Sequence, residues 1–246
     1  MEVNKARFYN IVYNTTLDDH QRYNIGTYKE KKLHIMLKRY FEDDPEYHEV
    51  PVNGYIADIC RDGVITEIET SGFTGLGPKL SAYLPEYSVN LVYPAPAKKY
   101  VSWIDPETSE ISDRRISPKK VGVYDAIFEL IRILPYVGHE NLTVTVMLLE
   151  IDEYKLLDGW SRDRKKGASR YERIPVDLYD IIELSTPADF EKYIPEVCTN
   201  EFTVKEFSKA AKIREERARA VIKVFEKLSL IEKKGKRGRS YVYSRI

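Results

Sequence analysis

Hydrophobic and polar positions along this chain follow two different periods. In the segment YKEKKLHIMLKRYF, residues 28–41, apolar side chains recur every three or four positions and basic ones lie opposite them, which is typical of an amphipathic helix. Three strand-like runs follow, at about residues 46–52, 55–61 and 64–70. Asp62-Gly63 between the last two runs predicts a two-residue hairpin, because glycine accepts the positive φ of a type I′ turn.

Further along, the same patterns predict alternating helices and strands. A glycine-rich loop after Gly72 leads to a short helix with Pro78 near its first turn, and the following strand, SVNLVYPAP, is expected to end at its prolines. Another hairpin is predicted from YVSWID and EISDRRI, then a helix from VYDAIFELIRILPYV, a strand from LTVTVMLLEID and a helix over residues 176–194. Helices between strands at this spacing indicate a mixed α/β sheet.

Charge divides the chain into an acidic body and a basic end. The composition is that of a globular protein, with 43% apolar and 32% charged residues and no net charge. Residues 200–246, however, hold 14 Lys and Arg against 6 Asp and Glu, whereas residues 1–199 hold 25 against 33. We therefore expect a large domain over residues 1–155, a basic loop and helical connector over 156–198, and a separate small domain over 199–246.

Several classes of protein are not supported by the sequence. The N-terminus MEVNKARFYN has no apolar signal core, and the longest strongly apolar run, LTVTVMLLEI, is too short to span a bilayer, so a cytoplasmic protein is expected. Cys60 and Cys198 give neither zinc-ligand spacing nor a disulfide framework. No P-loop, GxGxxG, HExxH or GxSxG motif is present.

The first hairpin carries acids where apolar residues would pack a sheet. With Asp62 and Gly63 in the turn, Asp58 faces Glu67, and both lie on one face of the sheet with Glu69. Opposed residues have Cβ atoms roughly 4.5–5.5 Å apart, and like charges there destabilise a sheet. A Mg²⁺ ion held by one or two carboxylates would offset the repulsion; the alternative is a wet face on which both acids point into water.

The order of these residues resembles the PD-(D/E)XK nuclease superfamily, the restriction-endonuclease-like fold. Its pattern is a helix with an acid, a hairpin with Asp and then (Asp/Glu)-x-Lys, a second helix and a further strand. Here Glu30, Asp58, Glu67-Ile68-Glu69, the helix of Lys79 and the strand SVNLVYP follow that pattern. The pattern lies within about residues 25–95, and the resemblance as a domain extends to about residue 150.

The resemblance implies an αβββαβ core and Mg²⁺- or Mn²⁺-dependent hydrolysis of phosphodiester bonds. Asp58 and Glu67 would be metal ligands, Glu30 would lie beside the metal, and Glu69 or Lys79 would orient the attacking water. The sequence departs from the pattern at Glu69, where the family has lysine; some members carry Glu there and others take the lysine from the next helix. A catalytically inactive DNA-binding or regulatory protein on the same fold is the alternative.

The basic end resembles a winged helix-turn-helix domain. Thr203 is expected to cap a short helix, and Ala218, Val221, Ile222, Phe225 and Leu228 recur at core spacing in a longer one, before a basic, glycine-containing turn between two strands. In DNA-binding members the second helix enters the major groove and the wing contacts phosphate. The expected DNA contacts are Arg214, Arg217, Arg219 and Lys223 on the helix and Lys233, Lys234, Lys236, Arg237 and Arg239 in the wing. The alternative is a winged helix that binds protein.

A second basic segment, WSRDRKKGASRYER, is expected to be exposed. It either contacts DNA phosphates or serves solubility, and its candidate contacts are Arg162, Arg164, Lys165, Lys166 and Arg170. Together these features predict a Mg²⁺-dependent DNA endonuclease targeted by a winged helix. Its expected partner is DNA, as a duplex, with a homodimer as a further option and no membrane association.

Overall fold

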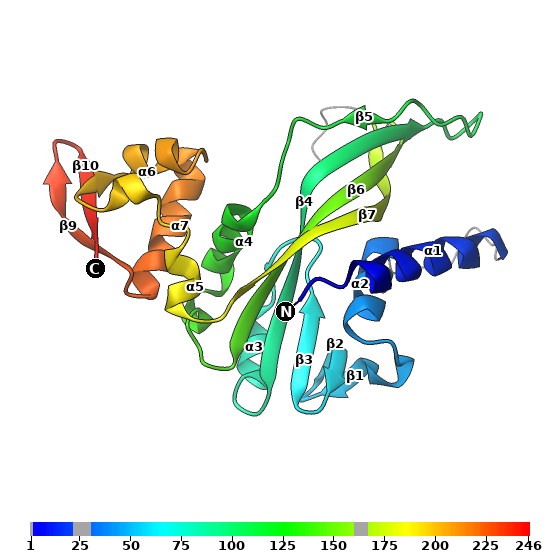
Figure 1. Ribbon diagram of the computed structural model, residues 1–246, viewed down its shortest axis with the longest axis horizontal. Coiled ribbons are helices and arrows are strands. Elements are labelled where there is room, and N and C mark those ends of the chain that lie inside the picture. The colour runs from blue at the N-terminus through cyan, green and yellow to red at the C-terminus, as the bar shows by residue number, and fades with distance from the viewer. Residues whose placement is uncertain (1, 22–30, 160–166) are drawn as a thin grey trace. The chain divides into compact units, whose positions relative to one another are not determined.

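The computed structural model describes residues 2–21, 31–159 and 167–246 (Figure 1). These residues form two compact units, each assembled from three segments of the chain. Unit 1 comprises residues 1–48, 94–121 and 147–181, and unit 2 comprises 49–93, 122–146 and 182–246. The domain boundaries expected near residues 155 and 199 fall inside unit 1 and unit 2, respectively.

A mixed β-sheet organises the chain, as the alternation of elements predicted. Among the described residues it has seven strands, in the hydrogen-bonding order β1-β2-β3-β4-β6-β7 with β5 paired to β4. Strands β2 and β3 are antiparallel, whereas β3 and β4 are parallel and are joined through helix α3 (Gly77–Tyr83), as a parallel connection requires. The strands are β1 (His48–Val52), β2 (Tyr55–Arg61), β3 (Val64–Ile68), β4 (Ser88–Ile104), β5 (Arg115–Ile116), β6 (Leu142–Leu156) and β7 (Ser169–Leu184).

The β2–β3 hairpin has the predicted register. Its paired residues are Ile59 with Thr66, Cys60 with Ile65 and Arg61 with Val64. Both turn residues have positive φ, 49° at Asp62 and 78° at Gly63, as a type I′ turn requires. The predicted turn therefore sets the alignment of the strands toward the acids, which lie four residues before Asp62 (Asp58) and four residues after Gly63 (Glu67).

Strand β4 does not end at its prolines, so that prediction is wrong. The Glu69 amide donates to the Val92 carbonyl at 2.9 Å, and the β3–β4 register stops at Val92. The backbone groups of every second residue in a strand point toward the same neighbouring strand. Pro94 and Pro96 therefore point to the same side as Val92, but β3 has already ended there. Proline there removes no ladder hydrogen bond, and β4 continues to Ile104. The last part of β4 forms the predicted second hairpin, with Tyr100 opposite Ile116 of β5.

Residues 169–184 form strand β7, so the helix predicted over 176–194 is wrong for most of its length. Leu178, Ile181 and Leu184 are buried at a spacing of three residues, which resembles a helical stripe. Pairing of β7 in the sheet overrides that local signal. A short helix, α5 (Pro187–Glu191), follows the strand.

The helices of unit 1 lie near the N-terminus. Helix α1 spans Lys5–Gln21 and α2 spans Lys32–Phe41. In α2 the predicted apolar stripe is buried, with Leu33 and Leu37 fully inaccessible. Helix α1 is linked to β7 through the Tyr9 hydroxyl, which donates to the Asp177 carboxylate at 2.6 Å.

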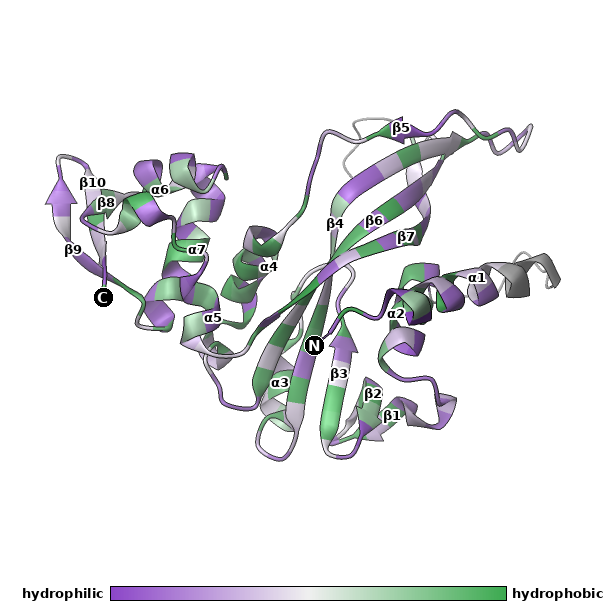
Figure 2. Ribbon diagram, in the orientation of Figure 1, coloured by the Kyte–Doolittle hydropathy of each residue, from purple (hydrophilic) through white to green (hydrophobic). Residues whose placement is uncertain are grey.

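The C-terminal part of unit 2 is a pair of helices with a small sheet. Thr203 caps α6 as predicted, because its hydroxyl accepts from the Glu206 amide and the Glu206 carboxylate accepts from the Thr203 amide. Helix α7 packs against both α6 and α4 (Figure 1), and the strand β9 is strongly hydrophilic (Figure 2). The elements of this part are η3 (Glu196–Cys198), β8 (Phe202–Thr203), α6 (Val204–Ala210), α7 (Glu215–Lys227), β9 (Ile231–Arg237) and β10 (Ser240–Arg245).

Two further helical segments of unit 2 come from the middle of the chain. The run VYDAIFELIRILPYV, predicted as one helix, forms α4 (Val123–Glu129) followed by the 3-10 segment η2 (Leu130–Tyr136). Non-helical backbone angles at Ile133 mark a kink two residues before Pro135, consistent with the restriction that proline places on the chain before it. A short 3-10 turn, η1 (Pro45–Tyr47), precedes β1.

Candidate functional site

The β2–β3 hairpin brings Asp58 and Glu67 together in unit 2. Beyond the last paired residues, the Ile68 amide donates a hydrogen bond to the Asp58 carboxylate at 2.7 Å. The carboxylate takes the place of the backbone carbonyl that would accept this bond in a continued ladder. Glu67 lies in β3, where residues 65–68 are all buried, and is only 2% exposed. The two acids therefore lie one position beyond the last paired residues of the hairpin, the charge of Asp58 acts on the Glu67 carboxyl, and Glu67 is removed from water.

The charged form of the Glu67 carboxyl is destabilised by its surroundings. Burial, together with the neighbouring charge of Asp58, raises the pKa of the Glu67 carboxyl from 4.5 to about 7, although Lys79 acts in the opposite direction. Glu69 adds a smaller repulsion. A buried carboxyl with a second acid beside it is the type of group that enzymes use in binding and catalysis.

Lys79 provides the positive charge of this cluster. Its ammonium group donates to Glu67 Oε2 at 2.8 Å and to the Ile56 carbonyl at 2.8 Å. Helix α3 positions it, because Pro78 starts the helix and the turn that follows carries Lys79 toward β2 and β3. Of Glu69 and Lys79, the two residues expected to orient the attacking water, Lys79 forms an ion pair with Glu67.

Tyr83 is a member of this cluster that the sequence analysis missed. It lies one helical turn after Lys79 on α3, is fully buried, and its hydroxyl has no hydrogen-bond partner among the described residues. Burial and the charges of Glu67 and Asp58 raise the pKa of the Tyr83 hydroxyl, so it remains protonated. The spacing of four residues from Lys79 was the available signal.

Glu69 begins the glycine-rich loop that follows β3. Gly72 has φ 101°, and a Cβ atom at this position would lie 2.5 Å from Glu129 Oε2. The Glu129 carboxylate in turn accepts from the Phe73 amide at 3.4 Å and from Arg132 at 2.8 Å. The positive φ of Gly72 favours glycine at this position, and any larger residue would also have to displace the Glu129 carboxylate. The hydrogen bond from the Phe73 amide to Glu129 connects the loop to helix α4.

The donor set suits a small, hard cation. Glu67 Oε1 is buried and has no hydrogen-bond partner in the described part of the chain, and Asp58 acts on the same carboxyl group. Mg²⁺ is bound through one or two carboxylates, with waters or phosphate completing its octahedron. Glu30, expected beside the metal, lies outside the described residues. Within residues 2–21, 31–159 and 167–246, no group of three or more His, Cys, Asp and Glu side chains could hold a metal.

Helix α7 carries three of the basic residues expected to contact DNA, and a fourth, Arg214, is its N-cap. Arg214, Arg219 and Lys223 are exposed, as expected. Arg217 is not: its guanidinium forms an ion pair with Asp125 and lies 5.0 Å from the ring centroid of Phe128. The expectation of an exposed Arg217 is wrong, because α7 packs this side against α4.

The β9–β10 hairpin presents the remaining basic candidates of unit 2. The ammonium groups of Lys233 and Lys236 lie 3.1 Å and 5.1 Å from the ring centroid of the exposed Tyr241. Lys234 pairs with Glu232 on the same strand, and Arg237 forms an ion pair with Glu206 at 3.1 Å. Lys233, Lys234, Lys236, Arg237 and Arg239 are all exposed, so the hairpin is a basic surface with one aromatic ring.

The second basic segment is described only in part. Arg162, Arg164, Lys165 and Lys166 lie outside the described residues. Arg170, at the start of β7 in unit 1, is half-exposed, with Nε 3.6 Å from the Glu153 carboxylate. Glu153 is buried and also accepts from Lys99 at 3.2 Å.

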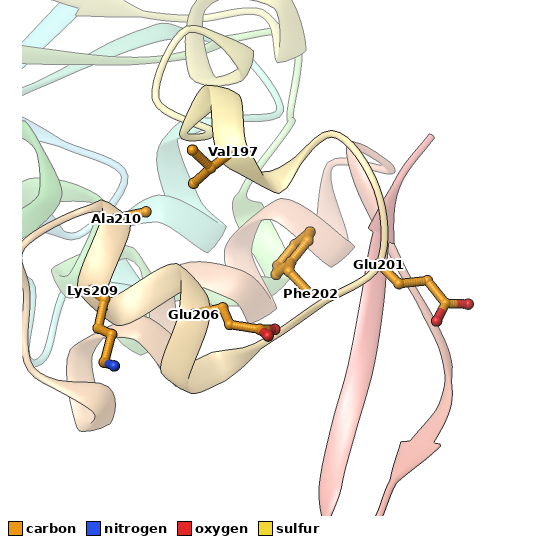
Figure 3. Close-up of a pocket in the computed structure, with 6 residues that line it drawn as sticks. All are labelled: Val197, Glu201, Phe202, Glu206, Lys209 and Ala210. Atoms are coloured by element: carbon orange, nitrogen blue, oxygen red, sulfur yellow. The ribbon is translucent and has the colours of Figure 1, made fainter.

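A shallow groove in the C-terminal part of unit 2 has no connection with the acids. It has a volume of about 490 Å³ and lies beside α6, with apolar lining from Val197, Phe202 and Ala210 while the Lys209 side chain points away (Figure 3). None of the residues of the Asp58 and Glu67 cluster lines it. The lining residues are Val197, Glu201, Phe202, Glu206, Lys209 and Ala210.

The described part of the chain contains no helix with the length and apolarity needed to cross a membrane. The chain is 30% identical over 167 residues to an uncharacterized protein of Treponema pallidum (strain Nichols), an alignment that covers 68% of this chain and 64% of that protein. No solved structure matches it. Residues 31–185 match the family model described as a domain of unknown function, DUF8091. Because this match includes the hairpin acids, Lys79 and more than half of the chain, the protein belongs to the DUF8091 family.

Proposed function

We propose that this protein is a Mg²⁺-dependent endonuclease that hydrolyses phosphodiester bonds in DNA at the cluster formed by Asp58, Glu67 and Lys79. The observation that carries the proposal is the convergence of two acids and one lysine from three different elements, with Glu67 buried and one of its oxygens unpartnered. Burying a charged group without full compensation is costly. Such a site is retained where a ligand completes it.

The order and direction of the strands support the same proposal. Helix α2 is followed by β1, β2 and β3, then α3 and β4, with β2 antiparallel to β3 and β4 parallel to it. This is the αβββαβ order of the restriction-endonuclease-like fold, which the sequence motifs resemble. The lysine reaches the acids from α3, the arrangement in which the following helix replaces the lysine of the hairpin motif.

Each side chain has a distinct part in the proposed reaction. Asp58 and Glu67 would hold the cation, which supplies charge stabilisation for the phosphate and helps to form hydroxide. The Lys79 ammonium lies 2.8 Å from Glu67 Oε2 and would release this oxygen when the cation binds. It would then orient the attacking water or stabilise negative charge on the phosphate. Glu69, which lies two residues after Glu67 at the end of β3, adds negative charge beside the site.

We further propose that the C-terminal part of unit 2 is a winged helix that holds the duplex. The two helices and the three-stranded sheet β8-β10-β9 support this, and so does the exposure of Lys223 on α7 and of the basic β9–β10 hairpin. Phosphate contacts of this kind give affinity that falls steeply with salt. Tyr241, flanked by two lysines, would pack against the sugar-phosphate backbone.

The test is cleavage of supercoiled plasmid, linear duplex and branched DNA with Mg²⁺, Mn²⁺ or EDTA. We expect cleavage that requires the metal and falls by at least about a hundredfold in Asp58→Asn and in Lys79→Met. Lys119→Met is the matched control, since Lys119 is exposed and belongs to unit 1.

Each result distinguishes the two functions considered for this fold. Cleavage that persists in Asp58→Asn would assign the activity to another site or a contaminant. Duplex binding without cleavage of any substrate would favour the non-catalytic DNA-binding role instead.

A further inference from the structure

Two buried polar atoms in the Asp58 and Glu67 cluster have no hydrogen-bond partner among the described residues. They are Glu67 Oε1 and the Tyr83 hydroxyl. Native proteins leave few buried polar groups unsatisfied, and each one calls for an explanation such as a bound water or a functional role. The occurrence of two in one cluster indicates a shared ligand.

The position of Tyr83 limits what it can do. Its side chain is fully buried on α3, one turn after Lys79, and its ring packs edge-on against Tyr55 with centroids 6.2 Å apart. A hydroxyl without access to solvent cannot touch a DNA substrate. Tyr83 can therefore act only through the groups beside it.

Those groups are acids, which need hydrogen-bond donors. The charges of Glu67 and Asp58 both act on the Tyr83 hydroxyl and raise its pKa, so it remains a donor. Lys79 occupies Oε2 of Glu67, which leaves Oε1 as the acceptor without a partner. No direct hydrogen bond joins the Tyr83 hydroxyl to Oε1, so any link between the two atoms has to pass through an intervening molecule.

We propose that Tyr83 is a positioning residue, which holds the Glu67 carboxylate through one buried water between the tyrosine hydroxyl and Oε1. The hydroxyl donates to the water, and the water donates to Oε1. A buried water is stable when it makes two to four hydrogen bonds. A hydrogen bond through such a water is enthalpically nearly as favourable as a direct one. The consequence for metal binding rests on the proposed function, but the bridge itself does not.

A double-mutant cycle in EDTA tests the bridge without metal or activity. Tyr83→Phe removes only the hydroxyl, and Glu67→Met removes both oxygens while keeping the length of the side chain. We expect the two changes to be coupled by at least about threefold in the equilibrium constant of unfolding. Tyr55→Phe with Glu67→Met is the control cycle, because Tyr55 packs beside Tyr83 but is partly exposed. Additive effects in the Tyr83 cycle would overturn the bridge.

Calorimetric titration of the full chain with Mn²⁺ tests the positioning role. Loss of a group that orients a ligand typically weakens metal binding tenfold or more, so we expect about tenfold weaker binding in Tyr83→Phe and unchanged binding in Tyr55→Phe. Equal affinity in Tyr83→Phe and the wild type would overturn the role. A wild type that binds no Mn²⁺ would overturn both the metal site and this role, whereas the double-mutant cycle would still decide whether the water bridge exists.

Discussion

Replacement of Glu67 by glutamine should stabilise the protein at high pH when no divalent cation is present. Burial and the charge of Asp58 raise the pKa of the folded-state carboxyl from 4.5 to about 7. The folded chain therefore binds this proton more tightly than the unfolded chain does. The contribution of Glu67 to stability is fully present below about pH 4.5 and is lost as the pH rises through 7.

The size of the effect follows from the same two values. Each pH unit between them corresponds to about 1.36 kcal/mol, so ionisation of Glu67 in the fold costs about 3 kcal/mol. Glu67 is only 2% exposed, and solvent screening is therefore weak. Glutamine mimics the protonated carboxyl, so Glu67→Gln should come within about 1 kcal/mol of the wild type at pH 5 and exceed its free energy of unfolding by up to about 3 kcal/mol at pH 8.

Urea unfolding in EDTA at pH 5 and pH 8 measures this difference. Glu86→Gln is the matched control, because Glu86 is exposed next to α3 and its replacement should leave the free energy of unfolding equal to that of the wild type at both pH values. Addition of Mg²⁺ at pH 8 should then stabilise the wild type and leave Glu67→Gln unchanged. If Glu67→Gln were less stable than the wild type at pH 8 in EDTA, the ion pair with Lys79 would outweigh the burial cost and the reasoning would be refuted.

Other predictions follow from contacts elsewhere in unit 2. Gly72→Ala should lower the free energy of unfolding by about 1–3 kcal/mol more than Gly75→Ala in urea unfolding, because both sites have positive φ but only Gly72 meets Glu129. Lys223→Gln should reduce the salt slope of duplex binding, log K against log [salt], by roughly 0.9, whereas Lys192→Gln at the C-cap of α5 should not. Arg217→Ala should lower stability in thermal unfolding without changing that slope, because its guanidinium packs on α4.

The acid pair could be predicted from the sequence because a two-residue turn fixes the register of a hairpin. Asp62 and Gly63 adopt the positive φ values that the turn type demands, and this places Asp58 opposite Glu67. The sequence could not show in the same way whether Glu69 or Lys79 would orient the attacking water, or that Lys79 would pair with Glu67. This pairing depends on where α3 packs, which is a tertiary contact.

The wrong predictions share a cause, because long-range pairing overrode a local signal. Strand β7 buries residues at a spacing of three, like a helix, but is paired in the sheet. Pro94 and Pro96 lie beyond the end of β3, where missing amides cost nothing. Arg217 is 92 positions from Asp125 in sequence, so no pattern within α7 could reveal the pair.

The most direct test of a cation site at Asp58 and Glu67 is a crystal structure of the protein with Mn²⁺, measured for anomalous scattering. We predict one strong anomalous peak within ligand distance of the Asp58 carboxylate and of Glu67 Oε2, with the Lys79 ammonium displaced from that oxygen. The peak should be lost in Asp58→Asn. No peak at saturating Mn²⁺, or a peak only at other carboxylates while Lys79 still contacts Glu67, would contradict this prediction.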